Sequence, residues 1–128
     1  MSEIQVGLKK EVQMIVSDED TATVMGSGTV AVLATPKMIA LMENASYKAI
    51  DEYIGEDCVT VGTHMDAKHL AATPVGMKVK AVAEVVEVKG KKVVFKVTAH
   101  DEKDLIGSGV HTRYIVNENN FTKEAYSK

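Results

Sequence analysis

Apolar residues recur every three or four positions between Ala34 and Tyr53, where the sequence reads ATPKMIALMENASYKAIDEY. This spacing is typical of a helix with one buried face. The expected members of that face are Met38, Leu41, Met42, Ala45, Ala49 and Tyr53. Thr35 is a favourable N-cap, Pro36 suits the first helical position, and Gly55 is a suitable stop. The pattern predicts one long helix, with Glu43 at the margin of its buried face; from the pattern alone, a solvated surface glutamate is the favoured interpretation of Glu43.

Elsewhere apolar and polar residues alternate, which is the period of half-buried strands. The alternation covers residues 4–16, 58–69, 77–88, 93–99 and 105–116. The face expected for the second of these runs consists of Val59, Val61, Thr63, Met65 and Ala67. A phase change at Val86 predicts a bulge, and Lys89-Gly90-Lys91 predicts a hairpin turn.

The last alternating run contains two glycines, and a polar segment follows it. Gly107 and Gly109 lie inside the last alternating run and favour a bulge or a close approach of two backbones. The polar residues from 117 onward are expected to be partly ordered at most.

One helix and about five strands joined mainly by hairpins predict an α+β domain, in which an antiparallel sheet wraps around the helix. A chain of 128 residues is long enough for one domain, and we expect residues 1–128 to form it. Such a sheet has an open edge, which favours pairing with a second copy of the chain.

Composition narrows the class of protein. Hydrophobic residues make up 45% of the chain and charged residues 26%, with a net charge of −3, which is typical of a soluble globular protein and not of a general nucleic-acid binder. No signal segment or membrane-spanning apolar run is expected. Cys58, the single cysteine, fits a reducing compartment. We therefore expect a cytoplasmic protein with neither nucleic acid nor membrane as a partner.

The histidines and the arginine are the remaining candidates for chemistry. His64 and His69 are five residues apart, so on one unbroken strand they face opposite sides and cannot share a metal. No other group has the spacing of a zinc site. His100 is interpreted as a turn residue and His111 as a sheet residue. Arg113 is the only arginine beside fourteen lysines; its planar fork suits phosphates and carboxylates, although a surface ion pair is an alternative.

Three stretches, ATPKMIALMENA, VGTHMDAKHLAATPVGMKVKAVAEV and KVTAHDEKDLIGSGVHTRYIV, resemble the fluoroacetyl-CoA thioesterase-like proteins of the hot-dog fold. The resemblance extends roughly from residue 8 to residue 116. It implies hydrolysis of short-chain acyl-CoA thioesters by a homodimer, or a dimer of dimers, with active sites at the subunit interface. It also implies catalytic roles for Thr35, Glu43 and His69, and substrate contacts for Gly62 and Arg113. Coenzyme A belongs to the substrate, and no separate cofactor or metal is expected.

Thioester hydrolysis requires a nucleophile or an activated water, a base, and a donor for the developing oxyanion. Glu43 could be the base or the nucleophile, and His69 could move protons or orient the carboxylate. Thr35 needs a base within reach, and a plain helix cap is its alternative role. Thr35 and Glu43 lie eight residues apart, roughly 12 Å along a helix axis. We therefore expect one subunit to supply Thr35 and its partner Glu43.

Alternatives remain for the substrate and the activity. The fluoroacetyl specialist of the family has an aromatic lid before the helix, whereas the only phenylalanines here are Phe95 and Phe121, so the resemblance does not extend to that substrate. Acyl-carrier-protein thioesters are another substrate class. A non-catalytic domain that binds acyl-CoA or another small ligand is the alternative function. A hydratase of this fold would need a closely spaced Asp/His pair, which is not found before Pro36.

Overall fold

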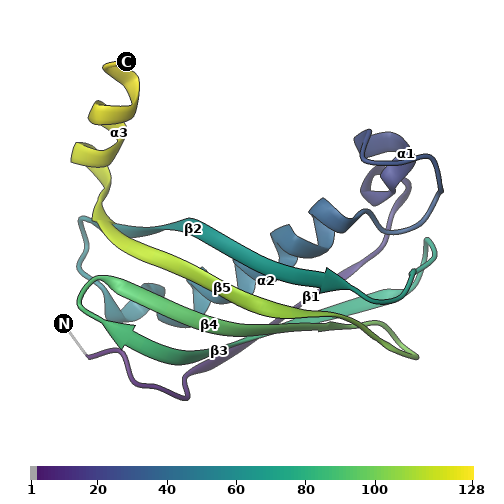
Figure 1. The fold of residues 1–128 in the computed structure, drawn as a ribbon, viewed down its shortest axis with the longest axis horizontal. Helices are drawn as coiled ribbons and strands as arrows, with labels where there is room; N and C mark the ends of the chain where they lie inside the picture. Colours follow the sequence, from purple (N-terminus) through teal and green to yellow (C-terminus); the bar gives the residue numbers. More distant parts are fainter. Residues whose placement is uncertain (1–2) are drawn as a thin grey trace.

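A five-stranded sheet and one long helix dominate the computed structural model, which describes residues 3–128 (Figure 1). The strands are β1 (Lys9–Ile15), β2 (Cys58–His69), β3 (Lys78–Lys89), β4 (Lys92–His100) and β5 (Leu105–Asn117). The long helix is α2 (Thr35–Ile50), and the shorter helices are α1 (Ala22–Met25) and α3 (Glu118–Tyr126). Two 3-10 turns, η1 (Asp18–Asp20) and η2 (Asp51–Tyr53), complete the secondary structure.

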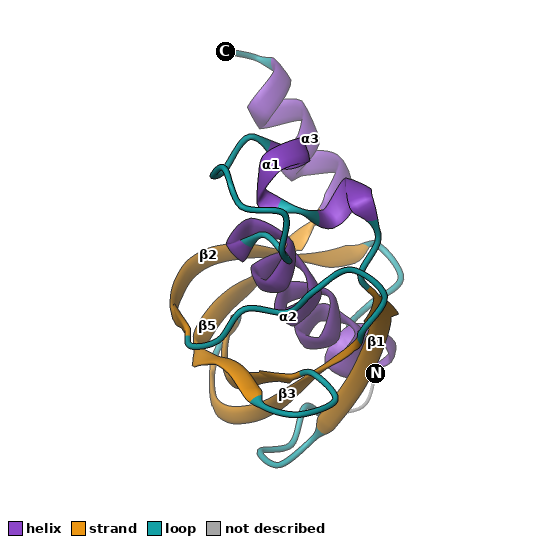
Figure 2. Cartoon of the chain, turned by 90° about the vertical axis from the view of Figure 1, so that its right-hand side faces the viewer, coloured by secondary structure: helices purple, strands orange, loops and turns teal. Residues whose placement is uncertain are grey.

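Neighbouring strands all run antiparallel, in the order β1-β3-β4-β5-β2. Figure 2 shows the sheet curving around α2, which lies on its concave side. The packing removes one face of the sheet and one face of the helix from water, which is the main stabilising contribution in such a two-layer domain. The predicted class, an antiparallel sheet of five strands wrapped around one helix, is confirmed.

The buried face of α2 agrees with its predicted spacing except at Leu41 and Tyr53, which are only half-buried, and Tyr53 lies beyond the helix in η2. Met38, Met42 and Ala45 are fully buried, and Ala49 is nearly so. They belong to a core cluster that also contains Val79, Ala81, Ala83, Val85, Val93, Phe95, Val97, Ala99 and Ile106 from the sheet. Glu43 is half-buried, at the margin of this face as predicted.

Both ends of the helix differ from the prediction. Ala34 has an extended backbone (φ −71°, ψ 139°) and is the N-cap, so Thr35 is the first helical residue and Pro36 the second. Proline is tolerated there because the first four helical N–H groups have no partner within the helix. The α-helix ends at Ile50 and continues as η2, so Gly55 lies beyond it instead of stopping it.

β2 contains a bulge that the alternation did not show. Its pairing with β5 shifts between Gly62 and His64, which leaves Thr63 as an extra residue. The extra residue reverses which side chains face the helix. The face predicted for the whole strand is therefore wrong in its first half: Met65 and Ala67 pack against the core, whereas Thr60, and not its neighbours Val59 and Val61, is buried. The bulge predicted in β3 is present, between Val85 and Glu87.

β5 and the residues after it give one confirmation and one correction. A side-chain carbon on Gly109 would collide with the carbonyl oxygen of Asp66 and come within 2.7 Å of Ala67 Cα, so the predicted close backbone approach is confirmed. The polar tail, however, forms the helix α3, whose N-cap Asn117 accepts a hydrogen bond from the N–H of Asn120. In Figure 1, α3 projects away from the sheet. Within residues 3–128, no helix is both long and apolar enough to cross a membrane.

Candidate active site

Thr35 and His69 meet where the start of α2 approaches the end of β2. Thr35 is the first residue of the helix and is exposed, and His69 is the last residue of the strand. Thr35 Oγ1 lies 2.6 Å from His69 Nδ1, the length of a short hydrogen bond. The Thr35 side chain is therefore not a plain cap. An imidazole within hydrogen-bond reach is what a hydroxyl group needs to act as a nucleophile.

The imidazole of His69 is in a half-buried position. Burial lowers the pKa of His69 below its usual value, and the backbone of Ala71 opposes this shift. The neutral ring is thus favoured at neutral pH. Its Nε2 atom is buried and has no hydrogen-bond partner among residues 3–128. Thr35 and His69 line a cavity of about 380 Å³, whose walls include Leu33 and Leu70.

A second set of polar groups surrounds Gly62 of β2. A side-chain carbon added to Gly62 would lie 3.2 Å from Glu43 Oε2, 3.2 Å from Arg113 Nη1 and 3.1 Å from His111 Cε1. Because Gly62 has no side chain, these three groups approach the bare backbone of β2, and any side chain at position 62 would crowd them. A carboxylate and a guanidinium group therefore converge on the same point of the strand.

Hydrogen bonds from β2 and β5 hold Arg113 in place. Its Nε and Nη2 donate to the hydroxyl and carbonyl oxygens of Thr60, both at 2.9 Å. Its Nη1 lies 3.1 Å from His111 Nε2. The guanidinium carbon lies over the ring of Tyr47, 5.8 Å from the ring centre, at a distance suited to a cation–π contact.

Arg113 keeps its positive charge although it is buried. Burial lowers the pKa of Arg113, and the negative charges of Glu43 and Asp51 oppose this shift. A guanidinium group remains protonated in proteins at neutral pH. The charge borders a cavity of about 270 Å³ lined by Tyr47, Asp51, Val59, Thr60 and Arg113. The site around Gly62 therefore combines a fixed cation with a half-buried carboxylate.

The five predicted site residues thus form two separate groups within one chain. Thr35 and His69 form one, and Glu43, Gly62 and Arg113 form the other. α2 carries both Thr35 and Glu43, which places them about 12 Å apart along its axis. A helix that starts after Thr35 would have allowed Thr35 and Glu43 to come closer together. Because α2 begins at Thr35, this alternative is excluded.

Thr60 and His111 belong to the second group and were missed from the sequence as site residues. The available signal for His111 was its position two residues before Arg113, since such residues share one face of a strand. No comparable signal existed for Thr60. Its place beside Arg113 depends on the bulge in β2, and the alternating pattern put Thr60 on the opposite face.

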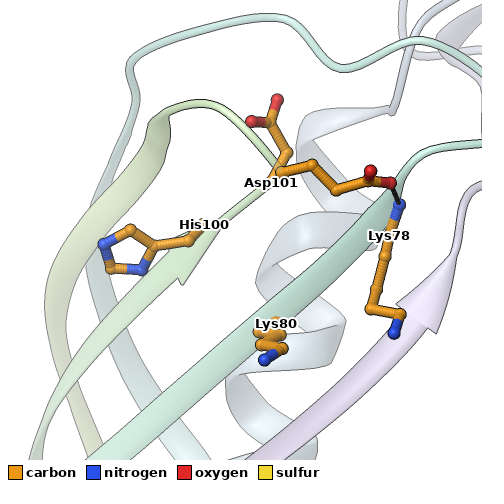
Figure 3. A pocket seen from close by; sticks show the side chains of 5 residues that line it. Lys78, Lys80, His100 and Asp101 are labelled. Atoms are coloured by element: carbon orange, nitrogen blue, oxygen red, sulfur yellow. Dashed lines mark hydrogen bonds between the residues drawn. The ribbon is translucent and has the colours of Figure 1, made fainter.

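Another concave surface lies at the paired ends of β3 and β4 (Figure 3). Lys78, Lys80, His100 and Asp101 line it together with Glu102, which accepts a hydrogen bond from the backbone N–H of Lys78. It contains none of the five predicted residues. Across the described part of the chain, no group of three or more His, Cys, Asp or Glu side chains could hold a metal ion.

Comparisons with known proteins identify the family and the fold. The model of the fluoroacetyl-CoA-specific thioesterase family matches residues 16–119. A fluoroacetyl-CoA thioesterase from Streptantibioticus cattleyicolor is 37% identical over 97 residues, which cover 76% of this chain and 70% of that protein.

Solved structures of fluoroacetyl-CoA thioesterase have the same fold. One is 30% identical, with a TM-score of 0.95, and the match covers 99% of this chain and 98% of that one. A variant in complex with fluoroacetate and CoA is 31% identical, with a TM-score of 0.88, over 92% of this chain and 99% of that one. The fold is therefore the hot-dog fold. With its matching family model, the chain belongs to the fluoroacetyl-CoA-specific thioesterase family of thioester hydrolases.

Proposed function

We propose that this protein hydrolyses short-chain acyl-CoA thioesters to a free acid and coenzyme A, in active sites shared between the two subunits of a homodimer. The observation that carries the proposal is the space beside Gly62, which Glu43 Oε2 and Arg113 Nη1 both approach. A carboxylate can act as a base or nucleophile, and a guanidinium group can bind the oxygen of an acyl group. The complex of a relative with fluoroacetate and CoA supports this substrate class.

Thr35 and His69 provide the second half of the proposed site. His69 Nδ1 accepts the proton of the Thr35 hydroxyl, and the oxygen then attacks the thioester carbonyl carbon. Coenzyme A leaves as the thiol with the proton that His69 accepted, and the acyl group stays on the Thr35 oxygen. Glu43 then takes a proton from a water molecule that attacks the acyl carbon, the acid is released, and this proton returns to the Thr35 oxygen. The positive end of the α2 dipole, at Thr35, favours the negative charge that develops on the carbonyl oxygen.

The proposed homodimer follows from the distance between the two halves. Neither Thr35 nor Glu43 can span about 12 Å along α2 to reach the other within one subunit. Two copies with antiparallel α2 helices would place Thr35 and His69 of one subunit beside Glu43, Gly62 and Arg113 of its partner. β2 carries both His69 and Gly62 and is an edge strand, so its free edge can pair with a second copy.

The proposed acyl group is short and not specifically fluorinated. Glu43 Oε2 and Arg113 Nη1 both lie close to the Gly62 backbone, so a group that contacts all three has to be small. No phenylalanine precedes α2: Phe95 is buried in β4 and Phe121 lies in α3. The chain therefore lacks the aromatic lid expected of a fluoroacetyl specialist, and short acyl groups in general are the proposed substrates.

The test is release of coenzyme A thiol from a panel of acyl-CoA thioesters. We expect turnover of short acyl groups by the wild type, and a loss on the order of 10² to 10⁴ in kcat with Glu43→Gln, which keeps the shape of the side chain but removes the base. Glu52→Gln, at an exposed position of η2, is the matched control. Wild-type turnover by Glu43→Gln would exclude the proposed role of Glu43. Tight acyl-CoA binding without any turnover would favour the non-catalytic alternative.

A further inference from the structure

We propose that His111 is a positioning residue for the substrate-binding arginine: its neutral imidazole holds the Arg113 guanidinium beside Gly62, and its protonation at acid pH releases that guanidinium. The consequence for substrate use depends on the proposed function. The contact itself does not, so it can be tested without a substrate.

Hydrogen-bond chemistry defines the protonation state of His111. Its Nδ1 lies 2.7 Å from the carbonyl oxygen of His64, which can only accept, so Nδ1 carries the hydrogen. Its Nε2 lies 3.1 Å from Arg113 Nη1, which can only donate, so Nε2 carries none. The two contacts together require the neutral Nδ1–H tautomer.

The imidazole is a rigid support. His111 is 1% exposed, and its ring stacks on Phe95 with the ring centres 6.3 Å apart. Its acceptor His64 directly follows the extra residue of the β2 bulge. The buried imidazole of His111 therefore contacts Phe95 of β4, the backbone at the β2 bulge and the guanidinium of Arg113.

Protonation would convert Nε2 from an acceptor into a donor that faces another donor, Arg113 Nη1. Burial, opposed by the His64 carbonyl and assisted by the charge of Arg113, lowers the pKa of His111, so this change belongs to acid pH. The charged and titratable groups facing the ring are Arg113 on β5, Glu43 on α2 and His64 on β2. Glu43 favours the protonated ring, but Arg113 and His64 disfavour it. The expected result is displacement of the guanidinium from Gly62.

Two substitutions separate the contacts of His111, because each amide retains one of them. In His111→Gln the amide oxygen can occupy the place of Nε2 and accept from Arg113. In His111→Asn the amide nitrogen can occupy the place of Nδ1 and donate to the His64 carbonyl, but nothing accepts from Arg113. If His111 only supports the β2 bulge, His111→Asn should behave like the wild type. If His111 positions Arg113, His111→Gln should behave like the wild type and His111→Asn should not.

The primary readout is nitrogen NMR of protein labelled at arginine, because the chain has a single arginine and so a single guanidinium group. We expect the Nη1 and Nη2 signals to be distinct and slowly exchanging in the wild type and in His111→Gln, and to merge in His111→Asn. In the wild type they should merge at acid pH, but not in His111→Gln. Wild-type signals in His111→Asn would overturn the proposal. If that variant does not fold, the histidine tautomer in the wild type decides, and an Nε2–H form would overturn it.

Kinetics provide the second readout. We expect KM for the best acyl-CoA substrate to rise about tenfold in His111→Asn, with a smaller change in kcat, and to stay near the wild-type value in His111→Gln. Only the wild type should lose affinity as the pH falls from 7 toward 5. If the protein has no thioesterase activity but the NMR pattern follows the expectation, the proposed function fails and the positioning role stands. If turnover is normal and KM does not distinguish the two variants, the positioning role fails alone.

Discussion

Arg113 donates three of its five N–H groups to protein atoms, namely the two oxygens of Thr60 and His111 Nε2. The other two are available to a ligand or to Glu43. A side chain that is fixed on one edge and free on the other binds an oxygen anion without first losing its own conformational freedom. This is a physical reason why the chain, with fourteen lysines, uses an arginine at this place.

Replacement of Arg113 by lysine keeps the charge but removes the fork that Thr60 holds. We expect Arg113→Lys to raise KM for acyl-CoA at least tenfold, because one ammonium group cannot bond Thr60, His111 and the substrate together. Steady-state kinetics on the best substrate measures the effect. Lys92→Arg, an exchange on a side chain paired with Glu87 outside the site, is the control. Unchanged saturation kinetics in Arg113→Lys would return Arg113 to a purely structural role.

The sequence suggested candidate site residues but could not predict the contacts between them. The resemblance implied Thr35, and the structure adds that its hydroxyl bonds His69. A helix-start pattern could not reveal this bond, because such a pattern describes only the residues next to Thr35 in the sequence. It placed the N-cap at Thr35, one residue after the observed N-cap, Ala34. Hydrogen bonds between strand ends and helix ends depend on tertiary packing, which a local pattern does not contain.

Among the elements, α2, β3 and β4 were predictable because each has a continuous apolar face. β2 was not, because its single extra residue depends on how β5 pairs with it. Thr63 is polar and exposed, and an alternating pattern accommodates it without any visible break. The bulge nevertheless allows Thr60 and Gly62 to share a face with Met65, which the site around Arg113 requires.

The two glycines of β5 allow its close approach to neighbouring elements, with different tolerance to substitution. A side-chain carbon at Gly109 would meet the backbone of Asp66 and Ala67, whereas one at Gly107 would meet the flexible end of Met38, 2.5 Å from its Sδ. We expect Gly109→Ala to lower the free energy of unfolding by about 1–3 kcal/mol or more, and Gly107→Ala by less. Urea unfolding curves measure both. Equal stability of the two variants would show that the β2–β5 contact can widen freely.

For the whole molecule, the α+β architecture followed from one helical period and five alternating runs, and it is confirmed. The arrangement of active sites in an assembly did not follow from periodicity. The proposed sharing of sites between two subunits rests instead on helix geometry, which separates Thr35 and Glu43 by about 12 Å along α2.

Mixing two inactive variants tests the shared active sites. Thr35→Ala and Glu43→Ala should each be inactive alone, because every site then lacks one group. After subunit exchange, a mixed dimer has one site with both groups intact, and we expect it to regain up to about half of the wild-type activity per dimer. Isolated mixed dimers that remain inactive, with both parent chains folded, would contradict the sharing of sites.

Stability should depend on pH through the two buried histidines. Burial lowers the pKa values of His69 and His111, while in the unfolded chain both titrate near 6.5. The unfolded state therefore binds more protons below that pH, so their contribution to stability is fully present above about 6.5 and is lost as the pH falls. One such group changes the free energy of unfolding by at most about 1.4 kcal/mol per pH unit, and the partly exposed His69 by less.

Urea unfolding at pH 7.5 and at pH 5.5 measures this dependence, above the range in which most carboxylates titrate. We expect a lower midpoint at pH 5.5, and a smaller difference between the two values in His111→Gln. A midpoint that does not change with pH would mean that neither imidazole is held neutral by the fold.

Because Thr35 and Glu43 lie on the same unbroken helix, the stretch between them is a spacer of fixed length. Inserting one residue would rotate everything beyond it by about 100° and carry Glu43 away from Gly62. The turn at Gly90 between β3 and β4 has no such constraint, since added residues can loop outward there. Natural variants of this chain are therefore expected to differ in length at this turn, and not between residues 35 and 43.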